Sequence, residues 1–288
     1  MQNYCVFALL MGGLIAVSGL SFRRAVITGG SSGIGFSIAA WLIQQNTEVL
    51  LVARDPKKLK QAATHLTSTY GTTTGVKTLS LDIADRALVT EKLGKACSDE
   101  LAPDLLVNCA GLSHPDYFQE LDSDIFDATV RTNLTGTWNV LKTVVPYMKQ
   151  GSRVVNVSSV AGLIGTFGYT AYAATKFGIV GLSEALRNEL SLKGIRVSVL
   201  CPPDTHTPQL ERENLTKPPE TKAISGNAGI LKPEQVARAL FNGLRKNRFI
   251  IIPGFQSKMI YLLKRLFPGI IYAMIDMYAK KPIGSDDE

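Results

Sequence analysis

The stretch RAVITGGSSGIGFSIAAWLIQQNTEVLLVARD, residues 24–55, decides the fold of this chain. It begins with an apolar run that ends at Thr28, turns through four glycines, and continues with apolar residues at helical spacing. A second apolar run, residues 48–53, follows. This order predicts a strand, a glycine turn, a helix and a parallel strand, in which backbone amides and the helix N-terminus hold a pyrophosphate. We therefore expect a nucleotide site around Gly29, Gly33 and Gly35.

The residues after the second predicted strand indicate which dinucleotide is bound. Sites that prefer NAD usually carry a carboxylate here, which accepts a hydrogen bond from the adenosine ribose. This chain has Ala53 followed by Arg54, and a guanidinium suits a 2′-phosphate through charge-assisted hydrogen bonds. Ser31 in the glycine turn is a further hydrogen-bond donor. The sequence thus favours NADPH/NADP, with the alternative that Arg54 only pairs with the neighbouring Asp55.

Apolar runs continue to alternate with helical patterns along the chain. The runs lie at residues 76–83, 104–111, 152–159 and 195–203, and one helical pattern lies near 86–98. This alternation predicts an α/β fold with a Rossmann-type, doubly wound parallel sheet in a single domain, residues 23–249. Ligands in such folds bind beyond the carboxyl ends of the strands. Those ends carry Thr28, Asp82, Asn108 and Ser159, which we expect to converge on one crevice.

A tyrosine and a lysine four residues apart are the candidate proton-transfer pair. On a helix, Tyr172 and Lys176 would share one face. An ammonium near a phenol favours the phenolate, so we expect Lys176 to lower the pKa of Tyr172 from its ordinary value near ~10. A tyrosine with a lowered pKa can exchange a proton near neutral pH. The alternative is a chance pair, since this spacing is common.

Several motifs in one order resemble the short-chain dehydrogenase/reductase family. They are TGGSSGIG (28–35), NCAG (108–111), NLTG (133–136), Ser159 and YAATK (172–176), and the resemblance covers about residues 24–249. It implies reduction of a ketone with NADPH, in which Tyr172 protonates the oxygen and Ser159 donates a hydrogen bond to it. It also implies that Lys176 holds the nicotinamide ribose and that Asn133 bends its helix and anchors a relay water.

The same resemblance, together with the position of Arg54 after the second predicted strand, implies a set of cofactor contacts. Asn108 would brace the central strand, and Asp82 would contact the adenine. A complete catalytic set argues against the remote alternative of a non-catalytic dinucleotide-binding scaffold. The expected contacts are Thr28, Gly29, Ser31, Ser32, Gly33, Ile34, Gly35, Arg54, Asp82, Asn108, Ala110, Gly111, Tyr172, Lys176, Pro202, Thr205 and Thr207.

The run CPPDTHTPQLERENLTKPPET, residues 201–221, interrupts the pattern of strands and helices. Proline removes a backbone donor and restricts the residue before it, so we expect neither a regular helix nor a central strand here. Relatives usually carry Pro-Gly and then a threonine at this point, whereas here Pro203 occupies the glycine position. Either Thr205 or Thr207 would contact the nicotinamide carboxamide.

The substrate loop, about residues 202–232, and the following KPEQVA (232–237) resemble one subgroup of the family. Members of that subgroup reduce 3-ketosphinganine, a long-chain lipid ketone drawn from the membrane. Another lipid ketone, such as a steroid, a retinoid or a 3-oxoacyl group, is the alternative substrate. Glu211, Glu213 and Glu220 are candidates to pair with the ammonium of a sphingoid ketone, although solvated loop acids are the simpler interpretation.

The net charge of +7 belongs to the C-terminal part of the chain. Between Arg245 and Lys281, eight basic residues occur with a single acid, Asp276, and the apolar runs 259–267 and 270–278 lie among them. Interleaved aromatic, aliphatic and basic residues suit a membrane surface with anionic headgroups. We expect residues 250–288 to be a membrane-associated extension, the alternative being a helix buried in the core or in a homo-oligomer. A nucleic-acid partner is not expected, because this segment is too apolar.

The N-terminal residues add a second apolar segment. Residues 4–20 carry no charge and precede Arg23 and Arg24. This length is near the lower limit of about 17 residues for crossing a bilayer, and the basic pair favours a cytoplasmic catalytic domain. We expect residues 1–22 to be an anchor, in the endoplasmic reticulum of a eukaryote or the inner membrane of a bacterium, with a cleaved signal peptide as the alternative. The four cysteines lack metal-like spacing, so we expect no metal and a reducing environment.

Overall fold

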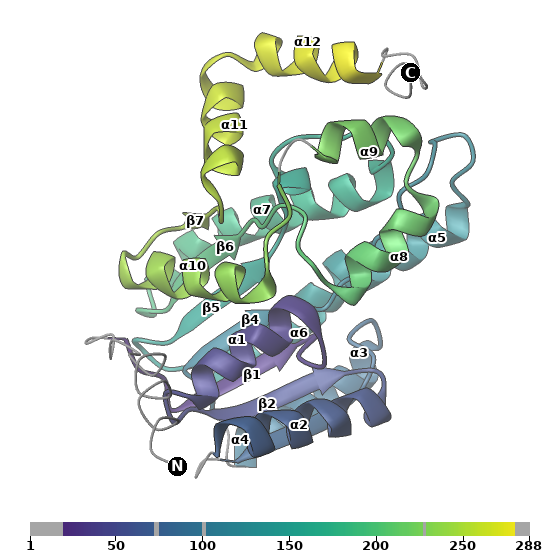
Figure 1. Ribbon diagram of the computed structural model, residues 1–288. Helices are drawn as coiled ribbons and strands as arrows, with labels where there is room; N and C mark the ends of the chain where they lie inside the picture. The colour runs from purple at the N-terminus through teal and green to yellow at the C-terminus, as the bar shows by residue number, and fades with distance from the viewer. Residues whose placement is uncertain (1–19, 72–74, 100–101, 227–228, 280–288) are drawn as a thin grey trace, which may run out of the picture.

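A seven-stranded parallel sheet forms the middle layer of the computed structural model (Figure 1), which describes residues 20–71, 75–99, 102–226 and 229–279. The strand order is β3-β2-β1-β4-β5-β6-β7, which confirms the predicted doubly wound sheet. The strands are β1 (Arg24–Thr28), β2 (Glu48–Ala53), β3 (Val76–Ser80), β4 (Leu105–Asn108), β5 (Arg153–Val157), β6 (Arg196–Leu200) and β7 (Ile250–Ile251).

Helices cover both faces of this sheet. One face packs against α1 (Gly33–Ile43), α2 (Pro56–Tyr70) and α10 (Pro233–Arg245), where the rings of Trp41 and Phe241 stack 3.5 Å apart. The other face packs against α4 (Gly94–Asp99), α6 (Gly136–Val144) and α7 (Thr170–Ser191). Shorter elements are α3 (Arg86–Leu88), η1 (Val89–Leu93), α5 (Ser123–Val130), η2 (Arg131–Thr135), η3 (Val145–Tyr147) and η4 (Val160–Gly162).

The direction in which successive strands are added to the sheet reverses between β1 and β4, and the predicted site lies at this switch point. The ends of the central strands are in register, with Thr28 opposite Asn108 and Asn108 opposite Asn156. The loops after these strands therefore leave the sheet at one edge, where ligands of doubly wound folds bind.

The expectation that residues 201–221 contain no regular helix is wrong. They include α8 (Pro208–Thr216) and the first residues of α9 (Pro219–Gly226). Each helix begins at a proline, and proline is tolerated at the first helical position because the amide it lacks would have no helical partner there. The Thr207 side chain caps α8 by accepting a hydrogen bond from the Leu210 amide at 3.2 Å. The expectation that this run contains no central strand is confirmed, because β6 ends at Leu200, before the run begins.

The C-terminal part of the chain adds one strand and two helices. Ile250 and Ile251 form β7 and pair with β6, so the sheet extends beyond the boundary at 249. The helices α11 (Phe255–Leu266) and α12 (Pro268–Ala279) then project above the ends of α7 and α9 (Figure 1). Ile271 of α12 joins a small apolar core with Leu163 and Cys201, and the Lys264 ammonium donates to the Leu163 carbonyl at 2.8 Å.

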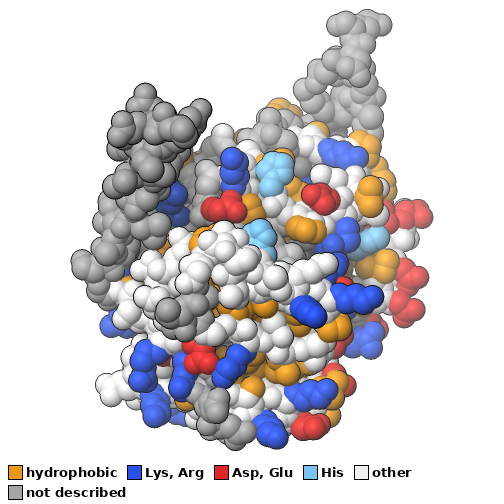
Figure 2. All heavy atoms as spheres, turned by 60° about the horizontal axis from the view of Figure 1, so that its bottom comes forward, with side chains coloured by type: hydrophobic (Ala, Val, Ile, Leu, Met, Phe, Trp, Pro, Cys, Tyr) orange, Lys and Arg blue, Asp and Glu red, His pale blue; other side chains and the backbone are white. Residues whose placement is uncertain are grey.

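Most of the predicted N-terminal anchor, residues 1–22, lies outside the described residues. The exceptions are Leu20, Ser21 and Phe22, of which Phe22 has its side chain buried in the main core and its carbonyl accepting from the Thr47 hydroxyl at 2.9 Å. Across residues 20–71, 75–99, 102–226 and 229–279, no helix is both long and apolar enough to cross a bilayer. Figure 2 shows the face turned away from α11 and α12, where Lys and Arg side chains lie at several separate places among neutral and apolar ones.

Candidate active site

One cavity of about 800 Å³ opens at the carboxyl edge of the sheet. Its walls come from the glycine turn after β1, the ends of β2 and β5, the start of α7, the run after β6, and the helices α8, α9, α11 and α12. The sequence-predicted residues that line it are Gly29, Ser31, Ser32, Gly33, Ile34, Gly35, Arg54, Gly111, Ser159, Tyr172, Lys176, Pro202, Thr205 and Thr207.

The glycine turn has the shape that a dinucleotide requires. Gly29 has φ +69°, and a Cβ there would lie 2.8 Å from the backbone N and Cα of Ala110. Gly33, at φ +55°, begins α1 directly at the cavity wall, where a Cβ would meet Thr207. The turn thus presents bare backbone and a helix N-terminus to the cavity, which fits a pyrophosphate.

The basic end of the cavity lies beyond β2. Arg54 is largely exposed, and its guanidinium is 3.9 Å from the Asp82 carboxylate. Asp55 does not pair with Arg54, because its carboxylate caps α2 by accepting from the amides of Lys57 and Lys58. Lys58 lines the cavity beside Arg54 and was missed from the sequence, although it is the third residue of a helix that starts at the predicted ribose end. Two cations at this end suit a 2′-phosphate.

Four predicted cofactor residues do not line the cavity: Thr28, Asp82, Asn108 and Ala110. Thr28 is fully buried, and its hydroxyl accepts from the amides of Cys109 and Ala110 at 3.1 and 3.2 Å. Asn108 donates to the Asn156 side chain at 2.8 Å, which ties β4 to β5 as expected of a bracing residue. These contacts, like that of Asp82 with Arg54, position the wall rather than form it.

Asn133 is buried at a distorted turn between two helices. It lies in the π-helical segment η2, which joins α5 to α6 and agrees with the expected bend. Its side chain accepts from the Leu112 amide at 2.8 Å and donates to the Leu112 carbonyl and the Thr175 hydroxyl. Asn133 therefore locks the loop after β4 onto the start of α7, close behind the proton-transfer pair.

Ser159 and Tyr172 meet at the centre of the cavity. Ser159 follows β5, and its hydroxyl accepts from the Ala161 amide at 3.1 Å and donates to the Pro202 carbonyl at 3.4 Å. Tyr172 lies in the first turn of α7, close enough to the Ser159 and Gln209 side chains for both to act on the pKa of its hydroxyl. A ketone oxygen placed here would reach both hydroxyl groups.

Lys176 lies one turn after Tyr172, as predicted, but its electrostatic effect differs from the expectation. Burial raises the pKa of Tyr172, the Glu213 carboxylate raises it further, and the Ser159 and Gln209 side chains only oppose this. The expected lowering of the tyrosine pKa is therefore wrong. Lys176 is itself buried, which lowers its pKa to about 8. Its ammonium donates to the Val157 carbonyl at 2.9 Å and lies 5.3 Å from the Tyr172 ring centroid.

The two candidate threonines differ in how their hydroxyl groups are used. Thr205 is buried and donates its proton to the Pro203 carbonyl at 2.8 Å. Thr207 accepts from the Leu210 amide, so its proton is left for another partner. This difference favours Thr207 as the donor to a nicotinamide carboxamide.

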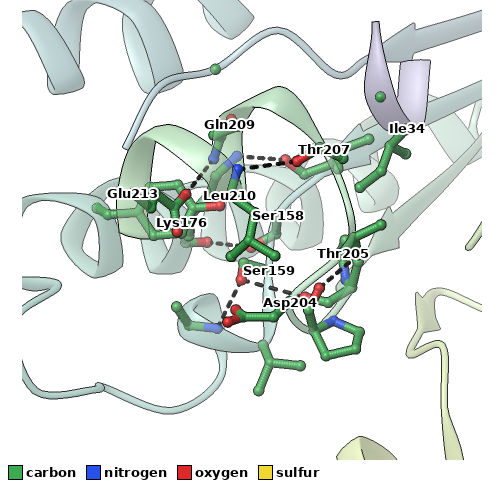
Figure 3. Close-up of a pocket in the computed structure, with 18 of the residues that line it drawn as sticks. Ile34, Ser158, Ser159, Lys176, Asp204, Thr205, Thr207, Gln209, Leu210 and Glu213 are labelled. Atoms are coloured by element: carbon green, nitrogen blue, oxygen red, sulfur yellow. Dashed lines mark hydrogen bonds between the residues drawn. The ribbon is translucent and has the colours of Figure 1, made fainter. Parts of the chain in front are cut away.

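A polar cluster on α8 was not recognised as a unit from the sequence. Glu213 is buried and accepts from the Gln209 amide at 2.9 Å (Figure 3). It also accepts from the Tyr169 hydroxyl at 2.7 Å. Lys217 is also buried and pairs with Asp204 at 2.9 Å. Of the other loop acids, Glu211 is exposed and Glu220 accepts from the Tyr117 hydroxyl at 3.0 Å. The helical spacing of Gln209, Glu213 and Lys217 was the available signal, but the expectation of an irregular loop concealed it.

The end of the cavity opposite the basic residues is apolar. Ile224 of α9, Ile260 of α11 and Ile271, Met274 and Ile275 of α12 line it. A ligand held at Tyr172 can therefore extend along side chains that belong to the C-terminal helices.

Comparisons with known proteins agree with this geometry. A model of the short chain dehydrogenase family matches residues 23–218. The chain is 40% identical over 248 residues to a 3-dehydrosphinganine reductase from Danio rerio, covering 85% of this chain and 75% of that protein. It is 36% identical over 268 residues to a 3-ketodihydrosphingosine reductase from Dictyostelium discoideum, covering 87% and 79% of the two chains.

A solved structure is similar as well. A short-chain dehydrogenase from Sphingobium yanoikuyae in complex with NADPH superposes with a TM-score of 0.71 at 25% sequence identity, covering 91% of this chain and 97% of that one. These matches confirm the resemblance that the motifs indicated. The chain belongs to the short-chain dehydrogenase family.

Proposed function

We propose that this protein reduces the ketone of 3-ketosphinganine to the alcohol of sphinganine with NADPH, a step in sphingolipid synthesis. The observation that carries the proposal is the cavity, which joins a basic dinucleotide end to an apolar end through Ser159 and Tyr172. A sphingoid ketone has a polar head and a long tail, and each methylene removed from water contributes about 0.8 kcal/mol. Relatives from Danio rerio and Dictyostelium discoideum carry names with this activity.

The cofactor contacts follow from the residues at the basic end. The glycine turn and the N-terminus of α1 would hold the pyrophosphate, and Arg54 with Lys58 would pair with the 2′-phosphate. Lys176 and Thr207 would hold the nicotinamide end. When bound, NADPH supplies the hydride that reduces the ketone carbon.

The chain's own groups manage the charge and the proton at the ketone oxygen. Ser159 donates a hydrogen bond as negative charge develops on that oxygen. Tyr172 then transfers its proton to the same atom. The raised pKa of Tyr172 keeps the phenol protonated at neutral pH, which is the form that a reduction requires. Asn133 would anchor the water that returns a proton to Tyr172 through Lys176.

We further propose that α11 and α12 rest on a membrane surface, with the catalytic domain on the cytoplasmic side and residues 1–19 as a second attachment. Basic Lys258 and Arg265 are exposed among the apolar residues, which suits anionic headgroups. The same helices line the apolar end of the cavity, so a lipid could pass from the bilayer to Tyr172 along them. The exposed apolar side chains are Phe255, Met259, Leu262, Leu266, Phe267, Ile270, Tyr272, Met274 and Met277.

A substrate panel tests the reaction. The purified protein is given NADPH and, in turn, 3-ketosphinganine, a steroid ketone, retinal and a 3-oxoacyl thioester, with oxidation of NADPH followed by absorbance. We expect the highest kcat/KM with 3-ketosphinganine. Turnover of another compound but not of 3-ketosphinganine would reject the substrate and keep the reaction class.

Vesicle sedimentation tests the membrane proposal. The double variant Leu266→Ser and Phe267→Ser should bind anionic vesicles less than the wild type, with Leu192→Ser, an exposed leucine after α7, as the matched control. Equal sedimentation of the double variant and the wild type, each lacking residues 1–19, would contradict a role for α11 and α12.

A further inference from the structure

A buried carboxylate faces the substrate end of the cavity from α8. Glu213 is 7% exposed and lines the cavity, although most glutamates lie in water. Its two oxygens are fixed, one accepting from the Gln209 amide at 2.9 Å and the other from the Tyr169 hydroxyl at 2.7 Å. In Figure 3, Gln209 and Glu213 lie beside Lys176. A charged side chain held this rigidly at a ligand-binding wall is suited to recognition.

Glu213 shares its paired cation, Lys217, with a second carboxylate, Asp204. The Lys217 ammonium is 2.9 Å from the Asp204 carboxylate but 4.0 Å from that of Glu213, so its hydrogen bond goes to Asp204. The Lys176 ammonium donates to the Val157 carbonyl, and burial lowers its pKa. A buried carboxylate is stabilised most by a cation at hydrogen-bond distance, so a ligand's ammonium would pair with Glu213 more closely than Lys217 does at 4.0 Å.

The position of Glu213 relative to Tyr172 indicates where that cation belongs. Gln209 donates to Glu213, and both side chains shift the pKa of Tyr172, so the carboxylate and the proton donor belong to one cluster. The ring of Tyr169, which donates to Glu213, is 5.7 Å from the ring of Tyr172. In 3-ketosphinganine the ammonium is on the carbon next to the ketone. A ketone held at Tyr172 and Ser159 thus carries its ammonium toward the wall that Glu213 occupies.

We infer that Glu213 is the specificity-determining residue of this reductase, and that its carboxylate receives the substrate's ammonium while Gln209 and Tyr169 hold it in place. The inference rests on the proposed function and adds a chemical reason for selecting an amino ketone. Ketones that lack the amine would leave the buried Glu213 carboxylate with Lys217, at 4.0 Å, as its cation in the complex. The apolar end of the cavity accepts a long chain, and Glu213 selects the head group.

A comparison of two substrates in two proteins tests this inference. Wild type and Glu213→Gln are assayed with NADPH and with 3-ketosphinganine or its deamino analogue, the same long-chain hydroxyketone without the amine. Glu213→Gln keeps the size of the side chain and one oxygen, which can accept the hydrogen bond from either Tyr169 or Gln209. Glu211→Gln, which removes an exposed carboxylate from the same helix, is the matched control.

We expect Glu213→Gln to lower kcat/KM for 3-ketosphinganine by about 10- to 100-fold, the loss typical of a hydrogen bond between charged groups. The kcat/KM for the deamino analogue should fall much less, and Glu211→Gln should leave the kcat/KM values for both substrates unchanged. An equal loss with both substrates would overturn the inference, because it would assign Glu213 a role in holding Tyr169 and Tyr172 only. The ratio of the kcat/KM values for the two substrates isolates the contribution of the ammonium, because a change in the Tyr172 pKa affects both values.

The wild type alone supplies a second measurement that does not depend on the folding of a variant. It should prefer 3-ketosphinganine to the deamino analogue by at least about 10-fold. A wild type that reduces both equally well would contradict the inference and leave the proposed function intact. A wild type that does not reduce 3-ketosphinganine at all would instead contradict the proposed function.

Discussion

Replacing Lys176 with methionine should abolish activity and yet stabilise the protein at neutral pH. Lys176 is 5% exposed, and burial lowers its pKa from 10.5 to about 8. A methionine fills nearly the same space without a charge. The variant therefore removes the free-energy cost of burying an ammonium in the folded chain. It also removes the hydrogen bond that this ammonium donates to the Val157 carbonyl.

The magnitude follows from the pKa of Lys176. A pKa difference of one between the folded and unfolded chains corresponds to about 1.4 kcal/mol, so lowering the pKa from 10.5 to about 8 costs the folded state about 3 kcal/mol. Losing the hydrogen bond to the Val157 carbonyl reduces this gain in stability by about 1–2 kcal/mol, because a buried acceptor is left unsatisfied. Lys176→Met should therefore raise the free energy of unfolding by about 1–2 kcal/mol at pH 7.

The effect should depend on pH in a defined direction. Below pH 8 the lysine is protonated in both folded and unfolded chains, so the whole cost is present. Between pH 8 and 10.5 the unfolded chain holds more protons than the folded one, so the stability of the wild type rises with pH. The advantage of Lys176→Met should consequently shrink across this window.

Urea unfolding of wild type and Lys176→Met at pH 7 and at pH 10, followed by circular dichroism, checks the magnitude and the pH dependence. Lys193→Met, which removes an exposed ammonium just after α7, is the control and should change the stability little. A variant less stable than the wild type at pH 7, or an advantage that grows with pH, would refute the reasoning. NADPH turnover is measured in parallel and should be lost.

Three further predictions concern the reaction, the cofactor and the glycine turn. Tyr172→Phe should lower kcat by about 10²–10⁴-fold while the protein still binds NADPH, as measured by fluorescence titration; near-normal turnover would remove Tyr172 as the acid. Arg54→Asp should raise the KM for NADPH about 10- to 100-fold and leave that for NADH nearly unchanged, and equal changes would contradict the 2′-phosphate contact. Gly29→Ala, which forces a methyl group against the Ala110 backbone at φ +69°, should lower the unfolding free energy by more than about 2 kcal/mol in urea. Gly75→Ala, where the added methyl meets nothing within 4 Å, should change it little.

The sheet and the catalytic positions were predictable because their signals are local. The apolar runs that became β1, β2, β4, β5 and β6 are bounded by turns, and their lengths suit buried parallel strands. The glycines after β1 and the four-residue spacing from Tyr172 to Lys176 each reflect a single backbone requirement. Such features follow from a few neighbouring residues, so the sequence alone indicates them.

The environment of those residues was not predictable, because it depends on distant segments. The pKa of Tyr172 rises through burial beneath α8 and the approach of Glu213, a residue 41 positions later. The prolines at 208 and 219 resemble helix breakers in the sequence, although at the first position of a helix they start one. β7 was missed because its two residues, Ile250 and Ile251, are too short a run to show a period.

The central claim, that this chain transfers a hydride from NADPH to the ketone of 3-ketosphinganine, is tested most directly with deuterated cofactor. The purified protein is incubated with 3-ketosphinganine and NADPH in which both hydrogens of the reactive nicotinamide carbon are replaced by deuterium, and the product is analysed by mass spectrometry. We predict sphinganine with a single deuterium on the carbon that bore the ketone, formed by the wild type and not by Tyr172→Phe. Sphinganine without deuterium, or unchanged 3-ketosphinganine in the wild-type sample, would contradict the account.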